Sequence, residues 1–579
     1  MKNKIRFIII FLLTLTVFVS CEDMMGDFLD KAPGVDVTED TIFSSKAQVE
    51  TFIATMYRTG LHTIFAREET SLTGSQYAMT SIACDETESS QTWTSQQGWN
   101  TGDITADNIQ SREDFRWPLR FKGLRYANIM LQRIDEVESL DQAYKQEIKG
   151  EALFLRALNH FEMFKRYGGA PIIDKKFELT DDFFVPRSSV EELVNFIVAD
   201  CDAAIALLPD TRSSDQKGRI TKGAALMLKS KTLLYAASPL FNTATPYLSM
   251  DDASNNDLIC YGNYDQNRWQ KAADAAKAVI DWAPSGGIHL ITDQGVDENY
   301  RYVYEINDNP EIILANKNIG ARDMWTFPWG SILPIGMGWG WHIGYSMTAN
   351  FLHKYEKQDG TPMEWSDTGG NDLKQKYEEI DRRFAQTVGI PGSYFNKDFP
   401  VITNYAGGKM NNQNKGGHII LKFVPRTMTF SSWNQMPNDI LFRLAEAYLN
   451  YAEALNEAQG PVQQAYDAVN IIRARSGQPD LPSGLSQEEF RERVRNERAI
   501  ELFDEEHRFF DIRRWMIAEQ DGVMQGDFYG LKIFQDPAAP DFRYQVYKIE
   551  TRTFKRRMYL HPYLRSEVLK GYLVQNPGY

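Results

Sequence analysis

Long amphipathic segments with recognisable ends restrict the fold of this chain more than any other feature of its sequence. In each segment apolar residues recur every three to four positions, which is the spacing of one face of an α-helix. Ser189 followed by Glu192 is the pattern of a capping box at a helix start, and Gly168 followed by Pro171 is typical of a helix stop. Helices are therefore predicted within residues 115–137, 141–168, 188–209, 221–242, 437–460, 461–477 and 486–503.

Small residues and short connections indicate how these helices pair. The segment 437–460 is followed at once by 461–477, with Gly460 and Pro461 at the turn. Small side chains let two helices approach closely, and the first segment carries Ala445, Ala447, Ala452, Ala454 and Ala458. Antiparallel pairs of this kind resemble tetratricopeptide units, although the repeats are too divergent to show the period of roughly 34 residues.

The N-terminus has the pattern of a secretory signal peptide at residues 1–20. Basic residues precede an apolar run over 7–19, which is shorter than the roughly twenty residues of a membrane-spanning helix, and the small residue Ser20 ends it. A lipid attached to Cys21 would explain a cysteine at the next position, and ordinary cleavage with an incidental cysteine is the alternative. Residues 21–37 are acidic and contain Gly and Pro, so we expect a lipidated tether.

The charge and the sparse cysteines and histidines argue against several functions. The net charge is −15, which argues against binding to nucleic acid or anionic lipid and leaves neutral ligands. Cys84, Cys201 and Cys260 cannot close a disulfide framework, and Cys201 lies on the apolar stripe of its helix as a small core residue. The sequence has no metal-binding spacing, nucleotide-binding loop or nucleophile motif, so neither a metal nor a cofactor is predicted.

Aromatic residues in irregular segments are the predicted ligand contacts. Between residues 285 and 435 helical periodicity is lost, and short strands are predicted over 310–316 and 418–424. A sugar ring presents a flat face of C–H bonds that stacks on an exposed indole, whose N–H stays free to hydrogen-bond. For all of these aromatic residues the alternative is burial in the core or in a protein interface, and for Trp339 and Trp341 packing against the scaffold is the preferred interpretation. The candidates are Trp93, Trp99, Asn100, Trp325, Trp329, Trp339 and Trp341.

Carboxylates with helical spacing form a second candidate site. Glu497, Glu501 and Glu505 lie one turn apart and could approach the separation of about 5–9.5 Å found in glycosidase pairs. An arginine neighbour lowers the pKa of a carboxyl group, which suits an ion pair rather than a general acid. The sequence therefore predicts a structural network with the surrounding arginines. These are Arg491, Arg493, Arg495, Arg498, Arg508, Arg513 and Arg514.

Several segments together resemble the SusD/RagB family of outer-membrane, nutrient-binding lipoproteins. Each is a weak signal alone, but they follow the family's order over nearly the whole chain after the signal peptide. One departure is Glu506, where the family usually has a glycine, with Asp504 in place of an apolar residue; both touch a helix junction. The segments are IKGEALFLRALNHFEMFKRYGGAPII (148–173), ITKGAALMLKSKTLLYAASPLFN (220–242), IRARSGQPDLP (472–482), ERAIELFDEEHRFFDIRRW (497–515) and LVQNPGY (573–579).

The resemblance implies a fold and an organisation. The fold would be mainly α, with tetratricopeptide-like helix pairs forming a right-handed superhelical scaffold, long irregular loops and a few short strands. Residues 38–260 would form the N-terminal helical region and residues 261–579 the C-terminal region, which includes the variable loops 285–435. Both would belong to one globular unit.

The resemblance also implies a function. Family members capture glycans without cleaving them and deliver them to a SusC-like TonB-dependent transporter in the outer membrane, and lipid attachment at Cys21 would hold the protein at the cell surface. The acidic pair Glu22-Asp23 is similar to export signals of such lipoproteins. One alternative is binding of peptides or other nutrients. A less favoured one is a secreted glycosidase with unpaired loop acids such as Glu305, Asp308 or Asp323.

Overall fold

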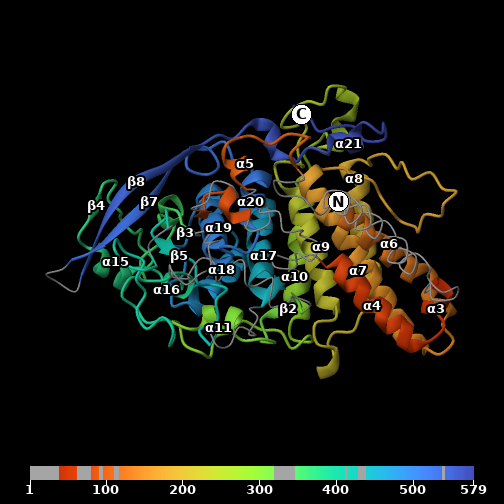
Figure 1. Cartoon of the computed structure of the whole chain (residues 1–579), viewed down its shortest axis with the longest axis horizontal. Helices are drawn as coiled ribbons and strands as arrows, with labels where there is room; N and C mark the ends of the chain where they lie inside the picture. The colour runs from red at the N-terminus through yellow and green to blue at the C-terminus, as the bar shows by residue number, and fades with distance from the viewer. Residues whose placement is uncertain are drawn as a thin grey trace, which may run out of the picture.

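Packed helices form one end of the molecule (Figure 1). The computed structural model describes residues 38–61, 80–89, 96–109, 117–317, 346–410, 414–427, 438–536 and 541–579. Each long helix packs against the next one along the chain, as in a solenoid of helix pairs. The mainly α fold expected from the sequence is confirmed. These helices are α4 (Lys46–Gly60), α6 (Trp117–Arg133), α7 (Gln142–Tyr167), α8 (Val190–Leu207), α9 (Lys222–Ala237) and α10 (Asn267–Trp282).

Local sequence signals fix the ends of these helices. At the start of α8 the Ser189 side chain accepts a hydrogen bond from the Glu192 backbone, and the Glu192 side chain returns one to Ser189, so the predicted capping box is confirmed. At the end of α7, Gly168 has φ of 77°, a left-handed conformation that glycine adopts without a Cβ clash. Both boundaries follow from residues within a single turn.

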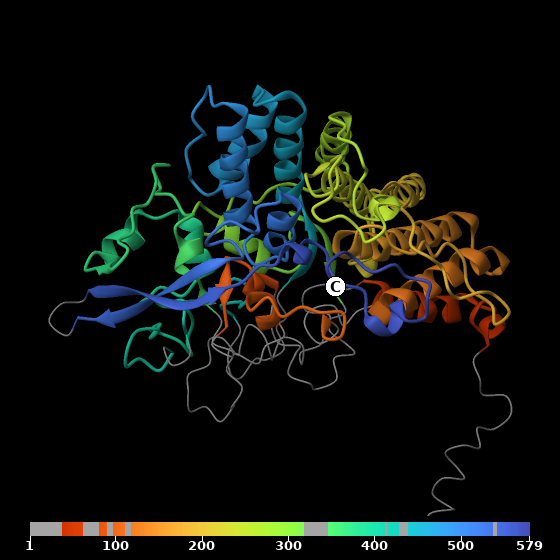
Figure 2. The same ribbon diagram turned by 90° about the horizontal axis from the view of Figure 1, so that it is seen from above.

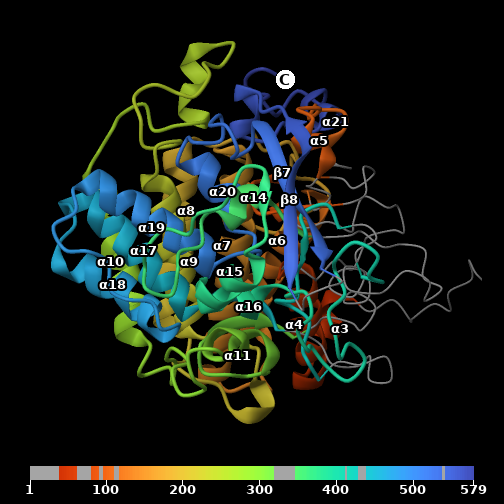
Figure 3. The same ribbon diagram turned by 90° about the vertical axis from the view of Figure 1, so that its left-hand side faces the viewer.

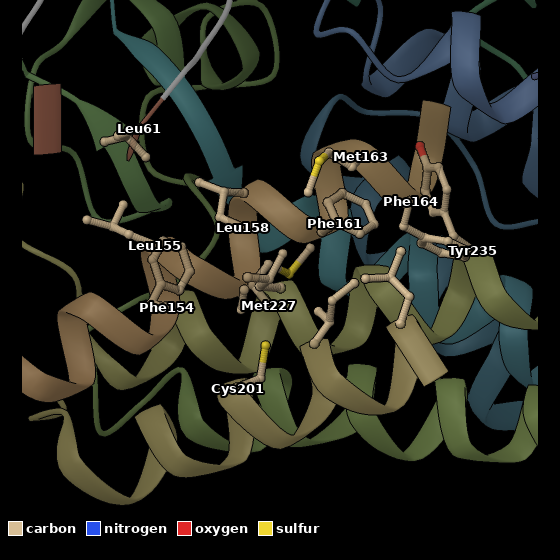
Figure 4. Packing of buried hydrophobic residues seen from close by; sticks show 14 of the residues in the cluster. Leu61, Phe154, Leu155, Leu158, Phe161, Met163, Phe164, Cys201, Met227 and Tyr235 are labelled. Carbon is tan, nitrogen blue, oxygen red and sulfur yellow. The ribbon is translucent and has the colours of Figure 1, made fainter. Parts of the chain in front are cut away.

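The core of the N-terminal half is apolar (Figure 4). Phe154, Leu158 and Phe161 of α7 are buried against side chains of α8 and α9, among them Met227. Cys201 of α8 is fully buried in the same cluster, which confirms its role as a small core residue. Burying an aliphatic or aromatic side chain of this size contributes about 1.5–3 kcal/mol, so this cluster is the main source of stability in this half.

A second group of helices stands beside the first (blue and cyan in Figure 2). It consists of α17 (Leu444–Gln459), α18 (Gln463–Arg475), α19 (Gln487–Glu501) and α20 (Arg508–Arg514). Helix α17 packs against α10, α18 and α19. The predicted alanine seam is buried at Ala445, Ala447, Ala452 and Ala454, which allows these close approaches.

Two predictions for this part of the chain need correction. The segment 437–460 was expected to be helical throughout, but its first described residues form β6 (Asp439–Arg443), which pairs antiparallel with β2 (Ile312–Asn316). Strand β2 confirms the strand predicted over 310–316. It is also the pairing partner of β6, which the periodicity of the segment 437–460 does not reveal. The strand predicted over 418–424 is limited to β5 (His418–Ile419), followed by an isolated bridge at Ile420.

A long hairpin crosses the other end of the molecule (Figure 3). Strands β7 (Gly526–Gln535) and β8 (Phe542–Arg552) pair antiparallel over their length, and β4 (Gly369–Gly370) adds a third strand to β8. The sequence prediction did not include this hairpin, whose strands are longer than the few short strands expected.

The remaining described helices are short, and those between residues 285 and 435 agree with the loss of helical periodicity there. Among the described parts of the chain, none of the helices combines the length and apolar character needed to cross a bilayer. The short α-helices are α3 (Glu39–Ile42), α5 (Gln97–Asn100), α11 (Asn299–Glu305), α14 (Ala349–Leu352), α15 (Leu373–Glu379), α16 (Arg382–Thr387) and α21 (Arg565–Val568). Turns of 3-10 helix span Thr80–Ala83, Ile134–Glu136, Ser214–Gln216, Ala253–Leu258 and Arg556–Tyr559.

Candidate ligand-binding face

A small three-stranded sheet brings together the ends of loops that are far apart in sequence. Strand β3 (Ser346–Met347) lies between β1 (Thr87–Glu88) and β5, with Glu88 opposite Ser346 and Met347 opposite His418. Residue 89 precedes the segment that contains Trp93, and Ser346 follows the segment that contains the four tryptophans from 325 to 341. One described end of each aromatic loop therefore lies beside an end of the other. We call this sheet and its flanking residues the loop face.

The predicted contacts divide into residues that the structure describes and residues that it does not. Trp93, Trp325, Trp329, Trp339 and Trp341 lie outside the described residues, and so does Cys21. Their predicted roles therefore stay predictions. Only Trp99 and Asn100 can be placed.

Trp99 is not an exposed platform residue, and this prediction is wrong. Its side chain is 1% exposed and lies in the main core. The indole meets the ring of Phe509 edge-on at 5.0 Å between centroids, and it lies 4.8 Å from the ring of His561. The guanidinium of Arg513 covers it at 5.2 Å. Both α20 and the C-terminal segment are needed to bury this ring, so the polar residues next to Trp99 gave a misleading signal.

Asn100 is a structural link rather than an exposed ligand contact. It is buried, and its side-chain amide donates to the backbone oxygen of Ile82 at 3.1 Å and to Glu550 at 3.3 Å. Its own backbone oxygen accepts from the N–H of Thr553 at 2.8 Å. These bonds fasten the short helix α5 to the end of β8 behind the loop face.

A polar cluster lies under the loop face. Glu88, which is almost completely buried, accepts hydrogen bonds from Gln97 at 2.8 Å and Arg552 at 2.5 Å, and Lys415 lies 3.4 Å away. Burial raises the pKa of Glu88 to about 7, although Arg552 opposes the shift. Glu88 and Glu550 are in hydrogen-bonding contact and share Arg552, so they are closer than the roughly 5 Å of a retaining glycosidase pair. The cluster therefore holds β1 to β8.

An exposed aromatic residue beside β5 was missed by sequence reasoning. Tyr394 is 68% exposed in the loop 389–410, whereas its neighbour Phe395 is buried in a small local core. The loop is attached to β5 by the hydrogen bond from the Gly389 N–H to the Ile419 oxygen at 2.9 Å. The sequence signal that could have revealed Tyr394 is the adjacent pair Tyr394-Phe395, in which one ring is exposed and the other is buried. Tyr394 thus has the exposure sought in the tryptophans, and its loop is bonded to the sheet of the loop face.

The acidic triplet forms a buried ion-pair network, as predicted. Glu501 accepts from Arg443 at 2.6 Å and from Arg383 at 3.1 Å, and it also contacts Arg475. Burial alone would raise the pKa of Glu501, but these three guanidinium groups lower it below its ordinary range. Glu505 is also buried, yet Arg443 and Lys422 lower its pKa to about 2. Both carboxylates are therefore fixed in their charged form.

The arginines expected to form this network are mostly bonded elsewhere. Glu497 binds Arg383 and Arg473, which lie outside its own helix. The nearby arginines instead bind other acids: Arg498 pairs with Asp511 at 2.6 Å, Arg508 with Asp85 at 2.8 Å and Arg514 with Glu453. The predicted role of the triplet was right, and the predicted partners were wrong.

The loop acids considered for catalysis also lie in ion pairs. Glu305 binds Arg426 at 2.9 Å, and Asp308 binds Lys317 at 2.9 Å. Asp323 lies outside the described residues. Among the described residues, no group of three or more His, Cys, Asp or Glu side chains could hold a metal ion.

The arrangement defines a class of protein: a solenoid of helix pairs on which a small sheet gathers the ends of long loops. Two family models match this chain. One, described as the SusD family, matches residues 292–579, and the other, described as "Starch-binding associating with outer membrane", matches residues 27–234. Together they match most of the chain, which belongs to the SusD/RagB family.

Individual relatives agree over nearly the full length. SusD-like protein P25 of Formosa agariphila is 23% identical over 541 residues, which are 89% of this chain and 90% of the relative. The crystal structure of a SusD-like protein from Bacteroides fragilis superposes with a TM-score of 0.76 at 27% identity, covering 95% of this chain and all of the other. A structure described as a SusD-like carbohydrate binding protein from the same species gives a TM-score of 0.70 at 20% identity, covering 92% and 99%.

Proposed function

We propose that this protein binds glycans at the cell surface without cleaving them and passes them to a SusC-like TonB-dependent transporter. The observation that carries the proposal is family membership over most of the chain, since one matching family model is described as starch-binding and a structural relative as carbohydrate binding. The acidic net charge favours neutral glycans over nucleic acid.

The loop face is the proposed binding surface. Support comes from the sheet β1–β3–β5, which places ends of the two aromatic loops side by side, and from the exposed ring of Tyr394 next to β5. Trp93, Trp325 and Trp329 are the proposed stacking residues, and packing remains the alternative for Trp339 and Trp341. Stacking gains roughly 25 cal/mol per Å² of buried apolar area, so a few rings give weak binding that suits release to a transporter.

The described carboxylates support binding without catalysis. A glycosidase needs one carboxyl group that can donate a proton and a second that is free to act as base or nucleophile. Glu501 and Glu505 are buried and bound by arginine, and Glu305 and Asp308 are paired with basic side chains. Incubation with polysaccharide should therefore release no oligosaccharides, as measured by chromatography of the products.

The membrane attachment is part of the same proposal. The matching model over residues 27–234 is described as associating with the outer membrane, and Cys21 follows the signal pattern directly. The variant Cys21→Ala should move the protein from the outer-membrane fraction to a soluble fraction, as measured by immunoblotting. Co-purification with a SusC-like transporter tests the partner, with the unrelated porins of the same membrane as the control.

Substitution of single tryptophans tests the binding surface. Affinity electrophoresis against a panel of neutral polysaccharides identifies a ligand, and a peptide digest run in parallel tests peptide binding instead. If Trp325 and Trp329 stack on the ligand as proposed, Trp329→Ala or Trp325→Ala should weaken binding while the melting temperature stays within about 1 °C, because a surface side chain contributes little to folding. Trp99→Ala is the matched control and should lower the melting temperature strongly. Unchanged glycan retention in the variant lacking Trp93, Trp325 and Trp329 together would disprove the proposed surface.

A further inference from the structure

An apolar area lies on the surface where the loop after α7 meets the C-terminal segment. The two segments are in contact, because the Phe184 ring lies 5.3 Å from the Tyr572 ring between centroids and the Arg187 guanidinium donates to the Val574 backbone oxygen at 2.8 Å. The contact does not involve the sheet β1–β3–β5 of the loop face. Five large apolar side chains are exposed here, and we call them the apolar patch: Leu179 (96% exposed), Phe183 (54%), Phe184 (53%), Leu569 (78%) and Val574 (43%).

The loop after α7 holds the exposed rings of the apolar patch in a defined conformation. The Asp182 carboxylate accepts a hydrogen bond from the backbone N–H of Phe184 at 2.9 Å. The Phe183 ring packs on the half-buried ring of Phe177, with 5.8 Å between centroids. Isolated exposed apolar residues are common, but several together on an ordered surface mark a place that another segment or partner covers.

The first described helix, α3, is fastened to the same loop. Glu39 in its first turn binds Lys176 at 2.9 Å, and Lys176 directly precedes Phe177. Arg133 at the end of α6 pairs with Asp40 at 2.7 Å, which keeps α3 beside α6 at the helical end of the molecule (Figure 1). The chain that precedes α3 therefore arrives next to the loop that carries the apolar patch.

The segment that precedes Thr38 carries apolar residues that a solvated tether does not need. Residues 21–37 lie outside the described residues, and their sequence includes the apolar pair Phe28-Leu29. Flexible linkers consist mainly of small and polar residues, since apolar side chains are unfavourable in water. The family model that matches the helical region begins at residue 27, before the described chain. Both observations favour a place in the folded unit for residues 27–37.

The length of this segment lets it reach the apolar patch. From Phe28 to Thr38 the chain advances ten residues. An extended chain spans at most about 3.5 Å per residue, so Phe28 can lie up to about 35 Å from the start of α3. A covalent link this short gives an effective concentration in the millimolar range. A weak apolar contact is then occupied most of the time, which favours this segment over a second copy of the chain or a free partner.

We propose that residues 27–37 dock on the apolar patch, with the pair Phe28-Leu29 against its exposed rings. The free tether then consists of residues 21–26 and spans at most about 20 Å, instead of about 60 Å for residues 21–37. The docking itself needs neither a membrane nor a ligand. Its consequence rests on the proposed lipid attachment: the short tether holds the globule close to the membrane and restricts its orientation.

Native-state proteolysis of the chain from residue 22 onward tests the docking. This chain lacks the lipid site, so a failure of docking is distinct from a failure of membrane attachment. Trypsin cleaves after Lys31, within the segment proposed to dock, and mass spectrometry of the released peptide 22–31 gives the rate. The double variant Phe183→Ser, Phe184→Ser should raise this rate about tenfold, because cleavage follows the population of the undocked segment.

A matched double variant controls for the loss of exposed apolar side chains in general. Tyr394 and Val401 are exposed to a similar degree, at 68% and 48%, on the loop beside β5. The variant Tyr394→Ser, Val401→Ser should leave the rate of cleavage after Lys31 unchanged. Equal rates in the two double variants would overturn the proposal, as would a rate in the Phe183→Ser, Phe184→Ser variant equal to that of the wild type.

Photocrosslinking identifies the surface that the segment contacts. With p-benzoylphenylalanine in place of Phe28, crosslinks should form to peptides from residues 175–187 or 569–575 of the same molecule. A mixture of isotopically labelled and unlabelled chains separates contacts within one molecule from contacts between two. Crosslinks that join only different molecules would overturn the proposal, because the patch would then bind a second copy. Absence of these crosslinks, with binding of the same chain to phosphatidylcholine vesicles, would assign the patch to the lipid surface instead.

Discussion

The two helical halves of the molecule each contain a large buried cluster, and these two clusters are held together by different forces. Around α7, α8 and α9 the core consists of apolar side chains such as Phe161 and Leu228. Where α18 and α19 meet β2 and β6, equally buried positions hold charged residues, with Glu501 at the centre. The apolar cluster depends on filled volume, and the cluster around Glu501, which we call the charged junction, depends on its charges keeping their partners.

This difference teaches where each half is vulnerable. An apolar core loses stability in proportion to the volume removed, and it tolerates changes of pH. The stability of a buried ion-pair cluster depends little on the volume of its side chains. Removal of one charge, however, leaves its partners without a counter-charge in a medium of low polarity. Substitutions and acid should therefore distinguish the halves.

Acid should have the largest effect, through the charged junction. Arg443 and Lys422 lower the pKa of the buried Glu505 to about 2, from an ordinary value near 4.5. A lowered pKa stabilises the folded state above pH 4.5, and this contribution of about 3 kcal/mol is lost as the pH falls through 2. The pKa of Glu501 is lowered in the same direction and adds to the loss. Calorimetry between pH 6 and pH 2.5 should show a steep fall in melting temperature.

Two controls limit the interpretation of the acid effect. Glu88 acts in the opposite direction, because its pKa is raised to about 7: its contribution is full below pH 4.5 and is lost as the pH rises through 7. The variant Glu505→Gln should have a lower melting temperature than the wild type at pH 6. Its melting temperature should also fall less between pH 6 and pH 2.5. A core variant such as Leu228→Ala should keep the wild-type pH dependence; if it flattened the curve as well, the assignment to the charged junction would fail.

The single substitution Glu501→Gln should destabilise the protein by about 3–5 kcal/mol. It removes the negative charge from three arginines, Arg383, Arg443 and Arg475, which then repel one another in the interior. Urea unfolding followed by circular dichroism measures the loss. Asp281→Asn, which removes an exposed pair with Lys277 on α10, is the matched control and should cost less than about 0.5 kcal/mol. Equal effects of the two variants would contradict the contrast between the halves.

Leu228→Ala should cost about 3 kcal/mol in the apolar half, through the lost burial and the cavity left behind. Leu228 is completely buried on α9. Its neighbour Leu226 is only partly buried, so Leu226→Ala should cost roughly a third as much. Unfolding by urea at pH 7 gives both values. A smaller loss at Leu228 than at Leu226 would show that the core does not lie where the structure places it.

Local signals explain which features could be predicted from the sequence. The capping box of α8 and the stop at Gly168 depend on residues within one turn, so the pattern of the chain reveals them. The hairpin was also open to prediction, because β7 alternates buried Phe528 and Leu531 with exposed Tyr529 and Lys532 around a strand bulge. Its signal was simply weaker than that of the helices.

Long-range partners explain most of what could not be predicted. The arginines that bind Glu501 come from α16, the end of β6 and α18, whereas abundant arginines nearer in sequence are bonded elsewhere. Trp99 is buried by Phe509 and His561, which lie far along the chain. In the same way, β6 replaced the first turns of a predicted helix because β2 offers it a ladder partner. Sequence periodicity carries no information about such contacts.

The smallest predicted effect concerns backbone strain at the charged junction. Glu506 has φ of 60°, the left-handed region that costs a residue with a Cβ about 1 kcal/mol. Glu506→Gly should remove this cost but should also loosen the unfolded chain, so we expect a net stabilisation of about 0.5 kcal/mol, measured as a rise in the urea midpoint. Glu506→Ala keeps the strain and is the control, with no stabilisation expected. If Glu506→Ala raised the urea midpoint as much as Glu506→Gly, the gain would come from removal of the carboxylate and not from relief of backbone strain. The cost of Glu506 to stability would then be electrostatic.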